Sequence, residues 1–444
     1  MTIPKAFLEE LIERVNLVDV VQSFVDIKKK GANWFGCCPF HSETSPSFSV
    51  SEIKKFYHCF GCGANGDAIK FLTELAGLSF VEAVEELSLS AGMAIPRESL
   101  PVQNSAQVIA ADQRQIFIGL NERAADAYRA DLAASAKAID FMTVHEISSS
   151  VAARFGLGYA PDSWRNLPNV FEHYGAPELS ACGLVRVADE RANVATRYDR
   201  FRDRILFPVR NGKGECLGFA GRSLGAGRPR YLYTADSPVF VRDREVFGLC
   251  ESRLAIREAS SVLVMATCMD VLALAEYGFE NVVATLGTDC SSTQLERLFR
   301  EVDRVTFCFP DTRQGQAAAR HTLEIALPLA TDTRTIRFLM APTSSDVGDF
   351  VREHGAEVFA QVLADAVPLS VFLIDIAMAE QDLTTSDARY EAATRAGQLW
   401  HQLPAGIFRL QIVKLVGEAI GIGDQELASI WNQSASVSVQ GGDG

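Results

Sequence analysis

The sequence predicts a multi-domain α/β protein: a small zinc-ribbon domain, a mixed α+β subdomain, a parallel sheet with flanking helices, and C-terminal helices. Three observations predict this. Two Cys/His pairs lie close together near the N-terminus, strand–turn–strand patterns fill the middle of the chain, and strands alternate with helices from residue 261 onward. The 444 residues are enough for several domains of ordinary size.

The two Cys/His pairs predict a zinc site. "CCPFH" contains Cys38 and His41, and "CFGC" contains Cys59 and Cys62, with two residues between the ligands of each pair. This spacing places four ligands around a tetrahedral Zn²⁺, and a site with four protein ligands is structural rather than catalytic. Cys37 competes with Cys38, but only Cys38 repeats the two-residue spacing. The alternative, buried thiols beside an unrelated histidine, leaves that repetition unexplained.

Basic and aromatic residues alternate around the zinc ligands and include Lys54, Lys55 and Phe56. Aromatic faces beside ammonium groups suit single-stranded nucleic acid. The alternative is a small core with a solvated lysine face, because a small domain needs its aromatic residues inside. The residues alone leave both interpretations open.

Changes in pattern along the chain predict six segments. "RILFPVRNGKGECLGFAGR" has the pattern of a hairpin, and "PRESLPVQNSAQVIAAD" that of a linker. The predicted segments are a zinc domain at 1–95, a linker at 96–112, an N-terminal subdomain of the core at 113–260, a sheet domain at 261–368, a C-terminal helical subdomain at 369–433 and a disordered tail at 434–444.

The strand "VTFCF" ends at Pro310, and Asp311 and Thr312 follow it directly. In parallel α/β sheets, ligands and metals bind just beyond the carboxyl ends of the strands. Four aspartates are predicted near this edge: Asp270, Asp311, Asp346 and Asp349. The alternative for each is an ordinary carboxylate in a loop or at a helix N-terminus.

Charge and composition restrict the class of protein. The net charge of −14 argues against nucleic acid or membrane contacts over the whole surface, but eleven Lys and Arg against six acids make residues 197–250 locally basic, at +5. No apolar run is long enough for a transmembrane helix, and the N-terminus does not have the pattern of a signal peptide. We therefore expect a cytoplasmic protein without membrane contacts.

Several of these motifs resemble bacterial DnaG-type DNA primases. The similar segments include "NWFGCCPFHSETSPSFSV", "KKFYHCFGCGANGDAIKFL", "RFGLGYAPDSW", "RYDRFRDRILFPVRNGKGECLGFAGR", "RPRYLY" and "MDVLALAEYG". The resemblance implies a zinc domain followed by a polymerase core built around a TOPRIM sheet. It also implies a single-stranded DNA template and contact with replication proteins. The family's helicase-docking domain is expected to be absent, because little chain remains after residue 433.

The resemblance assigns template and nucleotide binding to basic residues of the core. The matching positions are Arg154, Arg222, Arg230 and Arg242, and we add Arg202, Arg204 and Tyr231 from the same basic stretch. The alternative is a surface hairpin whose charges are paired with each other.

The resemblance also identifies positions where TOPRIM acids are missing. Ala266 stands at the glutamate position, Pro310 and Thr312 stand at the two Asp-x-Asp positions, and Gly348 stands at a later aspartate position. Loss of a key electrostatic group costs about 10²–10³-fold in rate. We therefore expect a DNA-binding protein with impaired or no catalysis.

Two further interpretations remain open at this point. One is an active primase, a DNA-directed RNA polymerase that uses Mg²⁺ or Mn²⁺ through the four remaining aspartates. The other is a protein-interaction scaffold in which the zinc site and the sheet are only structural. Primer synthesis distinguishes the active primase from the other two, and salt-dependent DNA binding distinguishes the DNA-binding protein from the scaffold.

Overall fold

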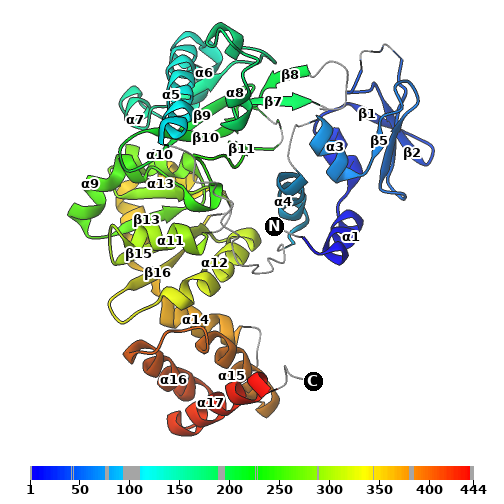
Figure 1. Cartoon of the computed structure of the whole chain (residues 1–444). Coiled ribbons are helices and arrows are strands. Elements are labelled where there is room, and N and C mark those ends of the chain that lie inside the picture. Colours follow the sequence, from blue (N-terminus) through cyan, green and yellow to red (C-terminus); the bar gives the residue numbers. More distant parts are fainter. Residues whose placement is uncertain are drawn as a thin grey trace. The chain divides into compact units, whose positions relative to one another are not determined.

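The computed structural model describes most of the chain (Figure 1). The chain forms two compact units. Unit 1 comprises Met1–Met142, Gly156–Pro208 and Cys216–Phe240, and unit 2 comprises Thr143–Phe155, Val209–Glu215 and Val241–Gly444. The described residues are 3–41, 43, 45–75, 80–93, 111–188, 196–225, 227, 229–287, 290–343, 345–379 and 385–440.

The N-terminal part of unit 1 is an antiparallel sheet with short helices. The strands follow in the order β1-β2-β3-β4-β5, and Phe48, Tyr57 and Phe71 are fully buried in the core. Its elements are α1 Lys5–Arg14, α2 Leu17–Gln22, β1 Ile27–Lys30, β2 Asn33–Gly36, β3 Phe48–Ser51, β4 Phe56–Cys59, β5 Asn65–Gly66, α3 Ala68–Leu75 and α4 Phe80–Ala91.

The rest of unit 1 is a four-stranded sheet, in the order β11-β10-β9-β6, with a long helix, α5, packed against it. The predicted hairpin forms strands β9 and β10. The elements are α5 Ala111–Ala134, α6 Ala136–Val144, β6 Gly158–Ala160, α8 Pro177–Ala181, β7 Val185–Ala188, β8 Thr196–Asp199, β9 Arg204–Arg210, β10 Cys216–Ser223 and β11 Tyr231–Tyr233. Of the predicted linker, residues 96–110 lie outside the described residues.

Unit 2 contains a six-stranded sheet in the order β12-β14-β13-β15-β16-β17. The four central strands are parallel, as predicted, whereas the two-residue edge strands β12 and β17 are antiparallel. The elements are α7 Ser149–Arg154, β12 Val246–Phe247, α9 Leu249–Ala259, β13 Val262–Met265, α10 Cys268–Glu276, β14 Val282–Thr285, α11 Ser292–Phe299, β15 Arg304–Pro310, α12 Arg313–Ala326, β16 Thr335–Ala341, α13 Val347–Ala364 and β17 Val367–Pro368.

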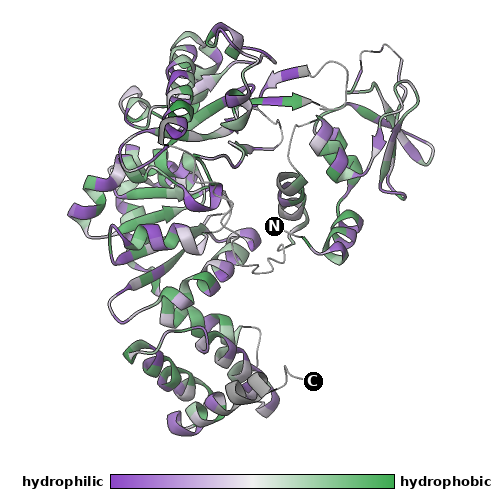
Figure 2. Ribbon diagram, in the orientation of Figure 1, coloured by the Kyte–Doolittle hydropathy of each residue, from purple (hydrophilic) through white to green (hydrophobic). Residues whose placement is uncertain are grey.

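Helices cover both faces of this sheet, and the strands are strongly hydrophobic (Figure 2). Val264, Phe307 and Phe338 belong to one buried cluster with residues of α11 and α12. Side chains alternate along a strand, so Cys308 and Leu339 face the other side, where α10 packs against α13. The carboxyl ends of β13, β15 and β16 therefore meet at one edge, from which α10, α12 and α13 begin.

Four helices follow the sheet: α14 Leu369–Met378, α15 Ser386–Trp400, α16 Ile407–Ile420 and α17 Asp424–Gln440. Their buried residues, such as Trp400 and Val416, join the core cluster of the sheet. Residues 434–440 were expected in a disordered tail, but α17 continues through them because no Gly or Pro lies between Asp424 and Gln440. Within the described residues, no helix is both long and apolar enough to cross a bilayer.

Candidate metal centres and nucleic-acid interface

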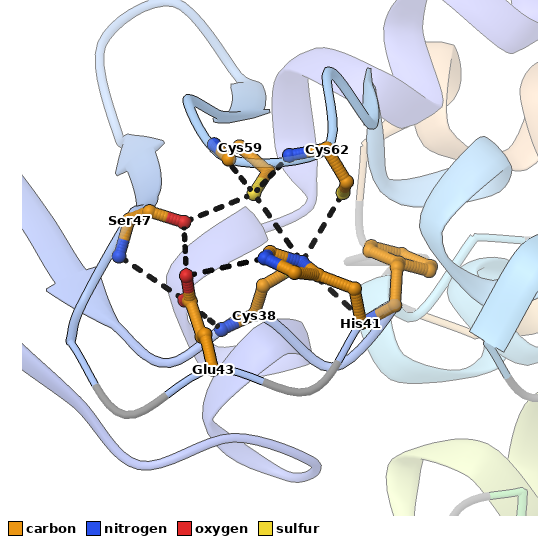
Figure 3. A network of polar contacts seen from close by, with 8 residues as sticks. Cys38, His41, Glu43, Ser47, Cys59 and Cys62 are labelled. Carbon is orange, nitrogen blue, oxygen red and sulfur yellow. Dashed lines mark hydrogen bonds and ion pairs between the residues drawn. The ribbon is translucent and has the colours of Figure 1, made fainter.

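Cys38, His41, Cys59 and Cys62 converge at the end of strand β4, and their ligand atoms lie within 4.8 Å of one another (Figure 3). Cys38 Sγ lies 3.7 Å from Cys62 Sγ, and Cys59 Sγ lies 3.8 Å from His41 Nδ1. A tetrahedral zinc with Zn–S bonds of about 2.3 Å requires sulfur atoms about 3.8 Å apart. The four side chains therefore fit Zn²⁺, which they bind as a structural ion, while Cys37 is exposed and lies outside the site.

Backbone N–H groups stabilise the thiolates that zinc requires. Phe40 donates to Cys38 Sγ over 3.4 Å, and Gly61 donates to Cys59 Sγ over 3.3 Å. Burial opposes ionisation of Cys59, but hydrogen bonds from Ser47 and from the N–H groups of Cys62 and Gly61 outweigh it and lower its pKa to about 6. Burial and the neighbouring sulfur atoms raise the pKa of Cys38 to about 12. A bound divalent cation offsets the repulsion between adjacent thiolates and so allows all three to ionise.

Asp270 is the central carboxylate at the carboxyl edge of the sheet in unit 2. It lies in the first turn of α10 and is 2% exposed. Its Oδ1 accepts the N–H of Gly348 over 2.7 Å, and its Oδ2 accepts the hydroxyl of Thr267 over 2.7 Å. Burial, then the nearby charges of Asp346 and Asp349, raise the pKa of Asp270 to about 7 despite these hydrogen bonds.

Asp346 and Asp349 approach Asp270 from the start of α13. Asp346 is the N-cap residue but its side chain does not cap the helix by a hydrogen bond, and Asp349 pairs with Arg352. A cation beside three acids would relieve their repulsion. Asp311 lies apart from this group, is exposed, and accepts a hydrogen bond from Gln316 over 2.8 Å. Within the described part of the chain, the zinc ligands are the only compact metal-ligating cluster.

The four positions at which the resemblance implied acids lie at the same edge of the sheet. Ala266 follows β13, Pro310 ends β15, and Gly348 lies in the first turn of α13. Thr312 caps α12, because its Oγ1 accepts the N–H of Gly315 over 3.0 Å. A Cβ atom on Gly348 would lie 2.9 Å from Ala273 Cβ and 3.2 Å from Asp270 Oδ1. An acid at position 348 would therefore displace its neighbours.

Arg204 is a core residue, and its burial argues against the predicted contact with DNA. Its guanidinium donates to the backbone carbonyls of Gly221, Arg230 and Pro229 at 2.8–3.3 Å. Burial in this environment lowers its pKa to about 10. Residue type alone did not distinguish Arg204 from the half-buried Arg202 nearby.

Arg202 lies instead at the surface, beside two aromatic residues that were not predicted. Its guanidinium carbon lies 3.8 Å from the centroid of the Trp164 ring, which is 55% exposed, and the ring of Tyr198 packs edge-on against Trp164 at 5.5 Å. Trp164 ends the quoted motif "RFGLGYAPDSW", so a signal was present in the sequence. The three side chains form a platform around the exposed Trp164, of the kind on which bases stack.

The other predicted nucleic-acid residues occupy varied environments. In unit 1, Arg222 on β10 pairs with Tyr231 on β11 and its guanidinium lies 4.8 Å from the centroid of the Phe141 ring, whereas Arg230 is exposed. In unit 2, Arg154 pairs with Glu280 at 3.0 Å, and Arg242 is half-buried in a 3₁₀ turn.

The predicted basic and aromatic residues of the zinc domain also differ from one another. Lys54 and Phe56 are exposed, but the ammonium group of Lys55 donates to the carbonyl of Val15 over 2.9 Å. Phe60, at 73% exposed, was not predicted, although it lies between the ligands Cys59 and Cys62.

Four family models match the chain in succession. They are the CHC2 zinc finger at residues 3–102, the N-terminal domain of the DNA primase catalytic core at 127–253, the Toprim domain at 260–338, and the DnaB-helicase binding domain of primase at 370–425. The first match covers the zinc ligands, and the third covers Asp270 and Asp311.

The last match corrects the expectation that a helicase-docking domain is absent. That expectation was drawn from the short length of chain after residue 433. The matched segment, 370–425, lies earlier, in helices α14–α16, which sequence analysis treated only as a helical subdomain.

Solved structures of similar fold cover most of the chain. "Structure of the DnaG primase catalytic domain bound to ssDNA" is 34% identical, with a TM-score of 0.66, and covers 71% of this chain and 100% of that one. The zinc-binding and RNA polymerase domains of the Aquifex aeolicus primase are 25% identical, with a TM-score of 0.60, and cover 94% of this chain and 98% of that one.

Curated relatives align along almost the entire chain. DNA primase of Escherichia coli (strain K12) is 37% identical over 98% of this chain and 75% of its own length. DNA primase of Pseudomonas aeruginosa is 36% identical over 97% of this chain and 65% of its own length. These matches, with the Toprim match, contradict the expectation of an inactive protein and support the alternative of an active primase. The chain belongs to the bacterial DnaG DNA primase family.

Proposed function

We propose that this protein is a DNA primase, a DNA-directed RNA polymerase that makes short RNA primers on single-stranded DNA. The observation that carries the proposal is the alignment of nearly the whole chain with DNA primases, through the zinc finger, catalytic core and Toprim regions together. We place the protein in the cytoplasm, because its template DNA and ribonucleotides are found there.

Mg²⁺ or Mn²⁺ at the Toprim edge would supply the electrostatic stabilisation that phosphoryl transfer requires. Because positions 266, 310, 312 and 348 carry no acid, the remaining acids must hold the ion. Asp270 is the principal ligand in this proposal, because burial, and then the charges of Asp346 and Asp349, raise its pKa, and a bound cation would offset both effects. Asp346 and Asp349 complete the group. Asp311, which follows β15 at the same edge of the sheet, is exposed and lies outside this group.

The template strand is held by exposed basic and aromatic groups of unit 1. The Trp164–Arg202 platform offers a stacking face beside a half-buried guanidinium that also pairs with Asp162 at 3.2 Å, and Arg230 adds an exposed cation. Lys54, Phe56 and Phe60 offer the same combination on the zinc domain. A similar catalytic domain was solved bound to single-stranded DNA, which supports this assignment.

Primer synthesis by the purified full chain tests the function. The protein is incubated with a single-stranded DNA template, ribonucleotides and Mg²⁺ or Mn²⁺, and radiolabelled RNA is resolved by length. We expect short, template-dependent, RNase-sensitive products. Products no more abundant than in a template-free control, with either metal, would overturn the proposal.

We also propose that helices α14–α16 bind a DnaB-type replicative helicase, on the basis of the family match at 370–425. Exposed apolar side chains in these helices, Tyr390, Ile407 and Leu410, are candidate contacts. A Tyr390→Ala, Leu410→Ala variant should lose stimulation of primer synthesis by the helicase and keep its synthesis on naked template. Equal stimulation of the variant and the parent would exclude this surface.

A further inference from the structure

The ring of His41 has a defined orientation at the zinc site. Its Nδ1 faces Cys59 Sγ at 3.8 Å, and its Nε2 faces the carboxylate of Glu43, 3.3 Å from Oε2 (Figure 3). A Cβ atom on Gly61 would lie 2.8 Å from His41 Nε2, so the backbone of the second ligand pair packs directly on this ring. The histidine thus presents one nitrogen to the metal ligands and the other to an acid.

Glu43 connects both sides of the zinc site. Its Oε1 accepts the backbone N–H of Cys38 over 2.6 Å and that of Ser47 over 3.1 Å, and its Oε2 accepts the hydroxyl of Ser47 over 2.5 Å. Ser47 Oγ in turn lies 3.2 Å from Cys59 Sγ, and the carbonyl of Ser47 accepts the N–H of Phe60 over 2.9 Å. One carboxylate therefore contacts both ligands of the first pair and, through Ser47, one ligand of the second.

We propose that Glu43 is a positioning residue for zinc. By accepting the Nε2–H of His41, it fixes the tautomer in which the lone pair of Nδ1 points toward the metal, and its negative charge makes that nitrogen more basic. Its bonds to the N–H groups of Cys38 and Ser47 hold the loop between the ligand pairs in the metal-binding conformation. Glu43 itself is two residues beyond the last ligand of the first pair and does not coordinate the ion.

Three variants of the full chain test this. Glu43→Ala removes all four contacts, whereas Glu43→Gln keeps an acceptor oxygen and removes the charge. Glu52→Gln is the matched control, since Glu52 is an exposed glutamate of the same domain. Zinc affinity is measured by competition with a chromophoric chelator. We expect affinity to fall about 10–100-fold for Glu43→Ala, by less for Glu43→Gln, and not at all for Glu52→Gln.

Two spectroscopic measurements separate positioning from simple loss of fold. Long-range ¹H–¹⁵N spectra of the zinc-loaded parent, with a His41→Asn variant for assignment, should show His41 protonated at Nε2 and metal-bound at Nδ1. In Glu43→Gln the Nε2–H resonance should move upfield, and the Co²⁺-substituted protein should keep the absorption of three thiolates and one imidazole.

Metal bound at Nε2 of His41 in the parent would overturn the proposal. An affinity of Glu43→Gln equal to that of Glu52→Gln would do the same, even if Glu43→Ala failed to fold.

Discussion

Asp270 carries a destabilising charge in the metal-free protein. Its pKa is raised from 3.8 to about 7 by burial and by Asp346 and Asp349, so the folded state binds its proton more tightly than the unfolded state does. The free energy of unfolding therefore falls as pH rises from about 4 to about 7. Asp270→Asn should melt a few degrees above the parent at pH 8 without metal, and this difference should close near pH 4. Equal melting temperatures of the two proteins at pH 8 would contradict the claim that the ionised Asp270 destabilises the metal-free fold.

Arg204 and Arg202 are two residues apart and have opposite roles. Arg204 satisfies three buried carbonyls, so Arg204→Met should cost about 2–4 kcal/mol in the free energy of unfolding, because buried acceptors lose their donor. Arg202→Ala should leave stability nearly unchanged and weaken single-stranded DNA binding, because its guanidinium lies on exposed Trp164. Urea titration and fluorescence anisotropy measure the two effects. Similar stability losses in both variants would contradict this division.

In the zinc ribbon, the sequence predicts the four zinc ligands but not the residues that surround them. A two-residue spacing encodes Cys38, His41, Cys59 and Cys62 directly. Glu43 joins the site only when the loop from Cys38 to Ser47 folds, so no spacing reveals it. The two-residue edge strands β12 and β17 are too short to show a period, which is why only the four parallel strands of the unit 2 sheet were predicted.

The turn from β15 to α12 shows the same limit. In the sequence, Thr312 occupies a position where an acid is expected, but in the structure its hydroxyl caps α12. Gly315 is required nearby, because a Cβ atom there would lie 2.0 Å from the carbonyl oxygen of Pro310. "PDTRQG" is thus a well-formed helix start as well as an altered metal-binding motif. The sequence shows which acids are missing, but it does not show that the carboxylate of Asp270 packs against Gly348 and accepts its N–H.

The zinc ribbon is an element whose folding depends on its metal. Cys59→Ser with Cys62→Ser should lower the zinc content from about one ion per chain to near zero, because two ligands cannot hold the ion. Chelation of the parent should expose the buried Phe48 and Tyr57 and unfold this domain, since site formation and folding are coupled. Inductively coupled plasma analysis and near-UV circular dichroism measure these outcomes. Full zinc retention by the variant would show that the ligands lie elsewhere.

At the scale of the whole molecule, an acidic chain must bind a polyanion through a local surface. The net charge is −14, yet residues 197–250 carry +5. Affinity for single-stranded DNA should fall steeply with salt, and Arg202→Glu with Arg230→Glu should weaken binding and reduce the salt slope by roughly 0.7 per lost phosphate contact. Circular dichroism should match the parent. An unchanged salt slope would place the template elsewhere.

The most direct test of the whole account is primer synthesis by the parent beside Asp270→Asn, at equal protein concentration and with Mg²⁺ or Mn²⁺. Asparagine keeps the shape and an acceptor oxygen of Asp270 but removes the charge that holds the metal. We expect template-dependent RNA from the parent and a loss of about 10²-fold or more in the variant. No RNA from the parent with either metal, or equal synthesis by the two proteins, would contradict catalysis through the remaining carboxylates.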